Sequence, residues 1–386
     1  MKKYAVLTRE PRCFLGSFDF SWEQRKVREV TDRYDNLRIP VAASLRVAGT
    51  TPYYGANGIQ DYVEGYTHDG EFILVAEDGA NDLKNYPVKC VKGRIWVNNH
   101  AHVLQGKYAC ADNQFLAYAI SQADIESLLV GGGRAKLNAE TLMDIELLLP
   151  SKDEQIQIGH YIARLDNLIT LHQRKFEKLT NVKKSMLEKM FPQNGSSYPE
   201  IRFKGFTDPW EQRKLGELIQ QGGSGGTPSA NNPDYYGGDI PFLSIADISG
   251  RDITNTAKTL TDEGLQNSAA WIVPSGAVSL AMYASVGKVG IIRQDTATSQ
   301  AFYNMVFENE ALRDFVFTRL EKAETDSEWE PYISTGTQRN LNADKVKSFS
   351  LDVPSNEEAS EISAYFANLD TLITLHQREP RFADTG

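Results

Sequence analysis

The most regular hydrophobic pattern in this chain lies between residues 151 and 191. Its apolar positions follow one another at alternating steps of four and three, and the series reads Ile158, Ile162, Leu165, Ile169, His172, Phe176 and Leu179. Such spacing keeps one face of a helix apolar and is typical of a coiled-coil seam. Ser151 with Glu154 forms a capping box, which predicts that the helix begins there. The helix would span about 60 Å at 1.5 Å per residue.

The same pattern occurs a second time near the end of the chain. Residues 354–379 repeat residues 150–175 at an offset of 204, with 15 of 26 positions identical. The second capping box is Ser355 with Glu358, and the second seam is Ile362, Phe366, Leu369, Ile373 and His376. We therefore expect two equivalent helices that pack against each other. Pro380 should end the second helix, because an interior proline breaks helical hydrogen bonding. In an antiparallel pair, this short arm would leave Ile158, Ile162 and Leu165 without intramolecular partners.

A second repeated marker precedes each helix by more than a hundred residues. The pentapeptide Trp-Glu-Gln-Arg-Lys stands at residues 22–26 and again at 210–214. Between the markers, residues 27–130 and 215–333 share no convincing similarity. Residues 132–138 then resemble residues 336–342 and end in an asparagine suited to cap a helix. We therefore expect the repeated ends to play the same structural role in both copies, whereas the two middles act in related ways on different targets.

The two middles have the composition of mixed domains with many strands. Short β-rich segments at 71–76, 93–97, 242–245 and 278–282 are bounded by turn residues. The fold class expected is α+β, with two mixed α/β domains and two long antiparallel helices.

Charge and cysteine content limit the classes of function. The net charge is −10, and residues 215–386 hold 24 acidic against 12 basic residues. A general basic coating for nucleic acid is therefore excluded, and any such contact must come from local loops. The three cysteines form no CxxC pair, which suits a reducing compartment. No segment reads as a signal peptide or membrane span, so we expect a cytoplasmic protein without membrane contact.

The chain contains fragments that resemble catalytic motifs, but each of these motifs lacks an essential residue. Asn232 to Tyr235 lacks the second proline of a methyltransferase loop, and Gly222 to Thr227 lacks the lysine of a P-loop. His100 and His102 have no evident third metal ligand, so a structural role is favoured. His172 and His376 lie at seam positions, where a residue that sets helix register is favoured over a metal or catalytic role. We predict no catalytic residue and no metal site.

The repeated openers, together with the helices that carry Leu-Ile-Thr-Leu-His-Gln-Arg, resemble type I restriction-modification specificity subunits over nearly the whole chain. Residues 53–58, 98–102, 227–228 and 236–241 look like parts of their target recognition domains. The resemblance implies that each domain reads one half of a bipartite site in double-stranded DNA. It also implies that the spacer helices dock two methyltransferase subunits, and that restriction subunits with translocase activity complete the holoenzyme. S-adenosylmethionine, ATP and Mg²⁺ would then belong to partner subunits, with no cofactor in this chain.

The resemblance also implies domain boundaries. Residues 1–150 would form the first target recognition domain and 151–192 the first spacer helix. Residues 193–354 would hold a linker and the second recognition domain, 355–379 the shortened second helix, and 380–386 a divergent tail.

Base-reading residues are expected in exposed loops, where polar side chains can meet base edges. Our candidates are Tyr53, Tyr54, Asn57, Asn98, Asn99, His100 and Arg134 in the first domain, and Thr227, Ser229, Tyr235, Tyr236, Ser285, Lys288, Gln338 and Arg339 in the second. Two alternatives remain. One is a coiled-coil adaptor that does not read DNA, and the other is a standalone methyltransferase or nuclease, which the missing motifs disfavour.

Overall fold

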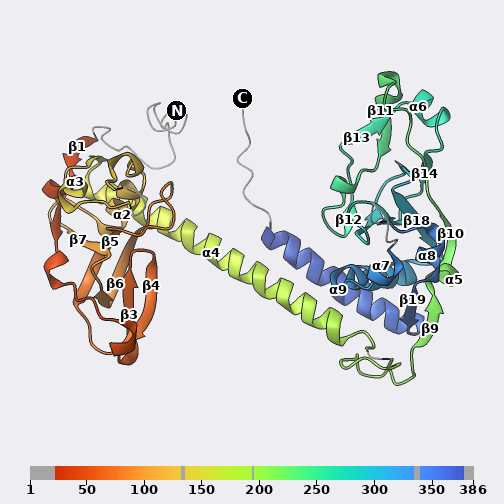
Figure 1. The fold of residues 1–386 in the computed structure, drawn as a ribbon, viewed down its shortest axis with the longest axis horizontal. Helices are drawn as coiled ribbons and strands as arrows, with labels where there is room; N and C mark the ends of the chain where they lie inside the picture. Colours follow the sequence, from red (N-terminus) through yellow and green to blue (C-terminus); the bar gives the residue numbers. More distant parts are fainter. Residues whose placement is uncertain (1–21, 132–134, 194, 334–339, 378–386) are drawn as a thin grey trace. The chain divides into compact units, whose positions relative to one another are not determined.

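The computed structural model describes residues 22–131, 135–193, 195–333 and 340–377. Two compact units are present, residues 1–170 and 171–386, and their division falls within the long helix α4 (Lys152–Lys189). Mixed sheets and helices, with a second long helix α9 (Asn356–Gln377), confirm the predicted fold class (Figure 1). No helix in the described ranges has the length and apolar character needed to cross a membrane.

The first unit is built on a six-stranded sheet in the order β2-β7-β5-β6-β3-β4. The long central strand β5 pairs antiparallel with both β6 and β7, while β3 runs parallel to β6. Asp112 caps helix α2, because its carboxylate accepts the N–H of Phe115, and the helix packs on the sheet through Leu116 and Ile120. The strands are β2 (Thr31–Arg33), β3 (Ala48–Gly55), β4 (Gly58–Val63), β5 (His68–Ala76), β6 (Val88–Val97) and β7 (Ala101–Gly106); the short helices are α1 (Val27–Val30), α2 (Asn113–Ser121) and α3 (Ala139–Met143).

Within each copy, the opener pairs with the strand that directly precedes the long helix. In the first copy, β1 (Glu23–Lys26) pairs antiparallel with β8 (Glu146–Leu149). In the second, β9 (Glu211–Lys214) pairs in the same register with β19 (Ser350–Val353). Each two-stranded ribbon closes its domain directly before a long helix. This pairing explains why the opener and the helix start were duplicated together.

The second unit contains a five-stranded sheet, β10-β18-β15-β16-β12, and a four-stranded sheet, β13-β11-β17-β14. Its strands are β10 (Ile219–Gly223), β11 (Tyr236–Phe242), β12 (Asp252–Ile253), β13 (Lys258–Leu260), β14 (Trp271–Val273), β15 (Val278–Ala281), β16 (Val289–Ile292), β17 (Thr296–Thr298) and β18 (Phe302–Phe307). Its further helices are α5 (Leu215–Leu218), α6 (Asp262–Gln266), α7 (Glu310–Thr325) and α8 (Ala343–Ser348).

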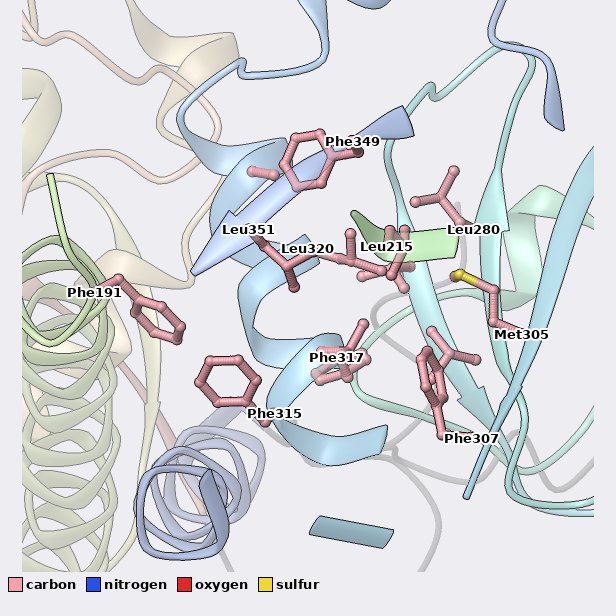
Figure 2. Close-up of a cluster of buried hydrophobic side chains, with 14 of the residues drawn as sticks. Phe191, Leu215, Leu280, Met305, Phe307, Phe315, Phe317, Leu320, Phe349 and Leu351 are labelled. Atoms are coloured by element: carbon pink, nitrogen blue, oxygen red, sulfur yellow. The ribbon is translucent and has the colours of Figure 1, made fainter. Parts of the chain in front are cut away.

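Aromatic side chains join the helices of the second unit to its sheet. Phe191, just after α4, lies 5.7 Å from Phe315 of α7 and 6.1 Å from Phe366 of α9, measured between ring centroids. Figure 2 shows Phe191 and Phe315 at one end of a cluster that continues through Phe317 toward Met305 and Phe307 of β18. Burial of this size fixes the C-terminal half of α4 against the second domain.

The two long helices pair antiparallel within the second unit. His172 meets His376, Lys183 bonds Asp370, and Phe191 faces Phe366, so that ascending numbers on α4 meet descending numbers on α9. Both capping boxes keep the predicted serine bond, because the Ser151 and Ser355 hydroxyls accept the N–H groups of Glu154 and Glu358.

Three expectations need correction or stay open. Ile158 packs against the core of the first unit, so the prediction that it lacks a partner is wrong, whereas Leu165 is 41% exposed. The strand expected at 242–245 ends at Phe242, because the Asp247 carboxylate accepts from both the N–H and the hydroxyl of Ser244 and turns the chain. Pro380 lies outside the described residues.

Candidate nucleic-acid interface

Three chain segments converge in the first unit: the loop 77–87 between β5 and β6, the turn 98–100 before β7, and the closing segment 135–138. The N–H of Glu77 donates to the carbonyl of His100 at 2.9 Å, and the N–H of Leu137 donates to the carbonyl of Glu77 at 2.7 Å. Asp78 forms a β-bridge with Lys136. We call this arrangement the three-segment junction.

The second unit contains the same junction, formed by residues 282–288, 299–301 and 340–342. The N–H of Met282 donates to the carbonyl of Ala301 at 2.8 Å, and that of Leu341 to the carbonyl of Met282 at 2.9 Å. Tyr283 forms a β-bridge with Asn340. These three backbone contacts of the first junction each have a counterpart here, although the loops share no recognisable sequence.

Several sequence candidates gather at the first junction. The Asn57 amide donates to the carbonyl of Gly79 and accepts the N–H of Asn81, both at 2.9 Å, and so supports the loop after β5. Asn98 is buried, and its side chain accepts the N–H of His100 at 2.8 Å. Asn99, at the tip of the turn, is exposed. The candidates therefore divide into residues that shape the turn and one that it presents to solvent.

Two other candidates lie in the core below. Tyr53 is 1% exposed and stacks on Trp96, with its hydroxyl accepting the N–H of Val41. Tyr54 is 6% exposed, and its carbonyl accepts the N–H of Asn98. Side chains buried in this way can position the turn, but they do not reach a ligand on the surface.

A charged network holds the first junction from beneath. His102 is 1% exposed and bonds the Asp35 carboxylate at 2.7 Å and the carbonyl of Leu137 at 2.9 Å. Burial alone would raise the pKa of Asp35, but hydrogen bonds from His102 and from the N–H of Val103 outweigh it and lower that pKa. Glu77 behaves alike, because bonds from Arg38 and Lys136 lower its pKa against the effect of burial.

The two histidines proposed as structural both have acidic partners. His100 lies 2.5 Å from Asp78, and His102 is held as described above. Across the described part of the chain, no three His, Cys, Asp or Glu side chains group so as to hold a metal ion. Their geometry agrees with a supporting role for the turn.

At the second junction, the Thr227 hydroxyl donates to the amide oxygen of Gln300 at 2.9 Å. Ser285 and Lys288 lie in the loop after β15, where the N–H of Lys288 donates to the carbonyl of Ser285. Ala284 in this loop has a φ of 58°, which is strained for a residue with a side chain. Gln300 was missed by sequence reasoning, because its equivalence to Asn99 is visible only through the shared backbone contacts.

The remaining candidates lie elsewhere or are not described. The Tyr236 hydroxyl donates to the carbonyl of Pro228, Tyr235 ends a short 3₁₀ turn, and Ser229 is exposed. Asn232 caps that turn, as expected of a turn rather than a catalytic loop. Arg134, Gln338 and Arg339 lie outside the described residues.

The predicted seam residues of the long helices are partly covered by the chain. Ile362, Phe366 and Leu369 of α9 are buried, and Phe176 and Leu179 of α4 are half-buried. Other apolar residues of these helices are exposed to solvent. Leu168 and its repeat counterpart Leu372 are 53% and 40% exposed, and Leu171 and its counterpart Leu375 are 60% and 59% exposed. Equivalent positions of the two repeats are thus exposed in the same way. The Nδ1 atoms of His172 and His376 lie 2.8 Å apart, so these two seam histidines contact each other.

Comparisons with known proteins agree with this architecture. Residues 21–181 and 207–381 each match the family model described as the type I restriction modification DNA specificity domain. A chain named as a type I restriction enzyme specificity subunit from Haemophilus influenzae is 44% identical over 149 residues, which are 39% of this chain and 38% of that one. The MjaIX specificity subunit of Methanocaldococcus jannaschii is 28% identical over 168 residues, or 42% and 38% of the two chains. The alignments thus span about two fifths of these relatives.

The fold also has a counterpart among solved structures. The type I restriction-modification S subunit from M. genitalium superposes with a TM-score of 0.62 at 13% identity, over 92% of this chain and 94% of that one. At this identity the similarity concerns the fold alone.

Proposed function

Because this chain belongs to the family of type I restriction-modification DNA specificity domains, we propose that it is the specificity subunit of such a complex and reads a bipartite site in double-stranded DNA. The observation that carries the proposal is the three-segment junction, which is built twice on one backbone plan. Each copy would read one half-site.

The side chains at equivalent positions of the two junctions differ in chemistry. Where the first has Asp78 and Lys136, the second has Tyr283 and Asn340. A shared frame with different side chains is the arrangement expected of two readers of different sequences, since base edges are distinguished by their donors and acceptors. Phosphate contacts from loop cations such as Lys288 would fix the register.

The exposed leucines support a proposal about partners. Leu168 and Leu171 on α4 correspond to Leu372 and Leu375 on α9, and all four are exposed. Two equivalent apolar sites suit two copies of one partner, because equivalent surfaces bind equivalent surfaces. We assign them to two methyltransferase subunits, which would carry S-adenosylmethionine. Restriction subunits would supply the ATP- and Mg²⁺-dependent steps, and this chain would contribute no catalytic group. Such a complex works on DNA in the cytoplasm.

Exchange of one recognition segment tests the proposal. Residues 27–130 are replaced by the corresponding segment of another family member, and the methylated motif is mapped in cells that also hold the methyltransferase. One half of the motif should change, while the other half and the gap stay constant. If both halves changed together, the domains would not read independently. If no bipartite motif appeared with either chain, the adaptor alternative would be favoured.

A further inference from the structure

The turn at the centre of each junction presents a single side chain to solvent. In the first unit Asn98 is buried, Asn99 is exposed and His100 is half-buried; in the second, Ser299, Gln300 and Ala301 show the same order. Asn99 and Gln300 are therefore structural equivalents. Both carry a carboxamide, and they differ in length by one methylene.

The backbone of this turn is held on both sides in each unit. A side-chain oxygen from the buried residue, Asn98 or Ser299, accepts the N–H two residues later at 2.8 Å or 3.2 Å. The carbonyl of that later residue accepts from the first residue of the neighbouring loop, Glu77 or Met282. A carboxamide on a rigid turn is presented in a fixed place, which is what recognition of a base edge requires.

In the second unit the carboxamide itself is oriented. The Thr227 hydroxyl donates to the amide oxygen of Gln300 at 2.9 Å, so the amide nitrogen is the group that Gln300 can offer as a donor to a ligand. Purine N7, guanine O6 and thymine O4 are the acceptors in the major groove.

We propose that Gln300 and Asn99 are the paired specificity-determining residues of the two domains, each contacting the edge of one base pair in its own half-site, and that Thr227 is a positioning residue for Gln300. The proposal rests on the function proposed above. It adds which side chain of each turn reads the base.

The test maps the methylated motif of the full chain, assembled with its methyltransferase, for Gln300→Ala and Asn99→Ala. Gln300→Ala should lower discrimination on the order of 10-fold at one base pair of one half-site. Asn99→Ala should do the same in the other half-site, and Thr227→Val should relax the same base pair as Gln300→Ala. Gln294→Ala is the matched control. Gln294 is also an exposed glutamine, but it follows the C-terminal end of β16, whereas the junction loop 282–288 precedes that strand; its amide donates to the carbonyl of Thr254. This variant should leave the motif unchanged.

An unchanged motif in Gln300→Ala, or relaxation in both half-sites, overturns the proposal. If Gln300→Ala abolished methylation, competition binding with duplexes altered one base pair at a time would decide. Loss confined to one position would support the proposal, and uniform loss across all duplexes would overturn it. A wild-type chain that yields no bipartite motif would instead refute the underlying function.

Discussion

A buried ion pair joins Arg202, in the segment that precedes the second opener, to Glu358 at the start of α9, and its removal gives a sharp prediction. The Glu358 carboxylate, 1% exposed, accepts two bonds from the Arg202 guanidinium at 2.7 and 2.8 Å. It accepts a third from the indole N–H of Trp210 at 3.2 Å. In Arg202→Ala the carboxylate stays buried without its cation. Breaking such a pair costs about 3–5 kcal/mol. The position of Glu358 in the first turn of α9 favours the lower end of that range.

The measurement is urea unfolding of the intact chain, monitored by tryptophan fluorescence. The free energy of unfolding is taken from the transition of the second unit. Arg213→Ala is the matched control, because it removes the same charge from an exposed pair with Glu217. Exposed ion pairs contribute little to stability, so Arg213→Ala should change the free energy of unfolding much less than Arg202→Ala. The double variant Arg202→Ala/Glu358→Gln should recover part of the loss, since a neutral amide is less costly to bury than a charge. Equal stability of Arg202→Ala and Arg213→Ala would refute the reasoning.

Four other predictions follow from the described contacts. Burial, together with the nearby charge of Asp370, raises the pKa of Glu321 despite the opposing effect of Lys183. The contribution of Glu321 to stability therefore falls as the pH rises through that pKa. In thermal melts, Glu321→Gln should be more stable than wild type at pH 8 and should gain less at pH 5. The pKa of His376 is lowered by loss of hydration and, to a smaller extent, by the charges of Lys175 and His172. The stability of the chain should therefore fall on acidification below the ordinary histidine range. His376→Gln should flatten this pH dependence of stability between pH 7.5 and 5.5. Asn57→Ala removes two bonds to the loop after β5 and should speed amide hydrogen exchange at residues 79–81 while the melting temperature changes little. Leu168→Glu with Leu372→Glu should weaken co-purification with the methyltransferase without unfolding the chain, whereas exposed Thr170→Glu should not.

The long helices were predictable because their information is local. Capping residues and apolar spacing gave residues 151–191 and 355–379, close to Lys152–Lys189 and Asn356–Gln377. Asn342 caps α8 as expected, by accepting the N–H of Lys345, whereas its counterpart Asn138 stands at the N-cap position of α3 without a side-chain capping bond. Such features depend on residues three or four positions apart, which a single sequence displays directly.

The junctions depend on contacts between distant segments, which one sequence does not display. The pairing of β1 with β8 joins residues more than a hundred positions apart, and although the repeated opener marked β1, no repeated segment marked β8. Tyr53 and Tyr54 were expected in an exposed loop because Gly-rich surroundings suggested a turn, yet β3 runs through both and buries them. The equivalence of Asn99 and Gln300 emerged only from matching hydrogen bonds.

The most direct test of the central claim is a map of methylated bases in DNA from cells that express this chain with its methyltransferase and no other type I system. The account predicts one methylated motif composed of two specified half-sites separated by a gap of constant length and unspecified sequence. A single continuous motif, or methylation without sequence preference, would contradict it.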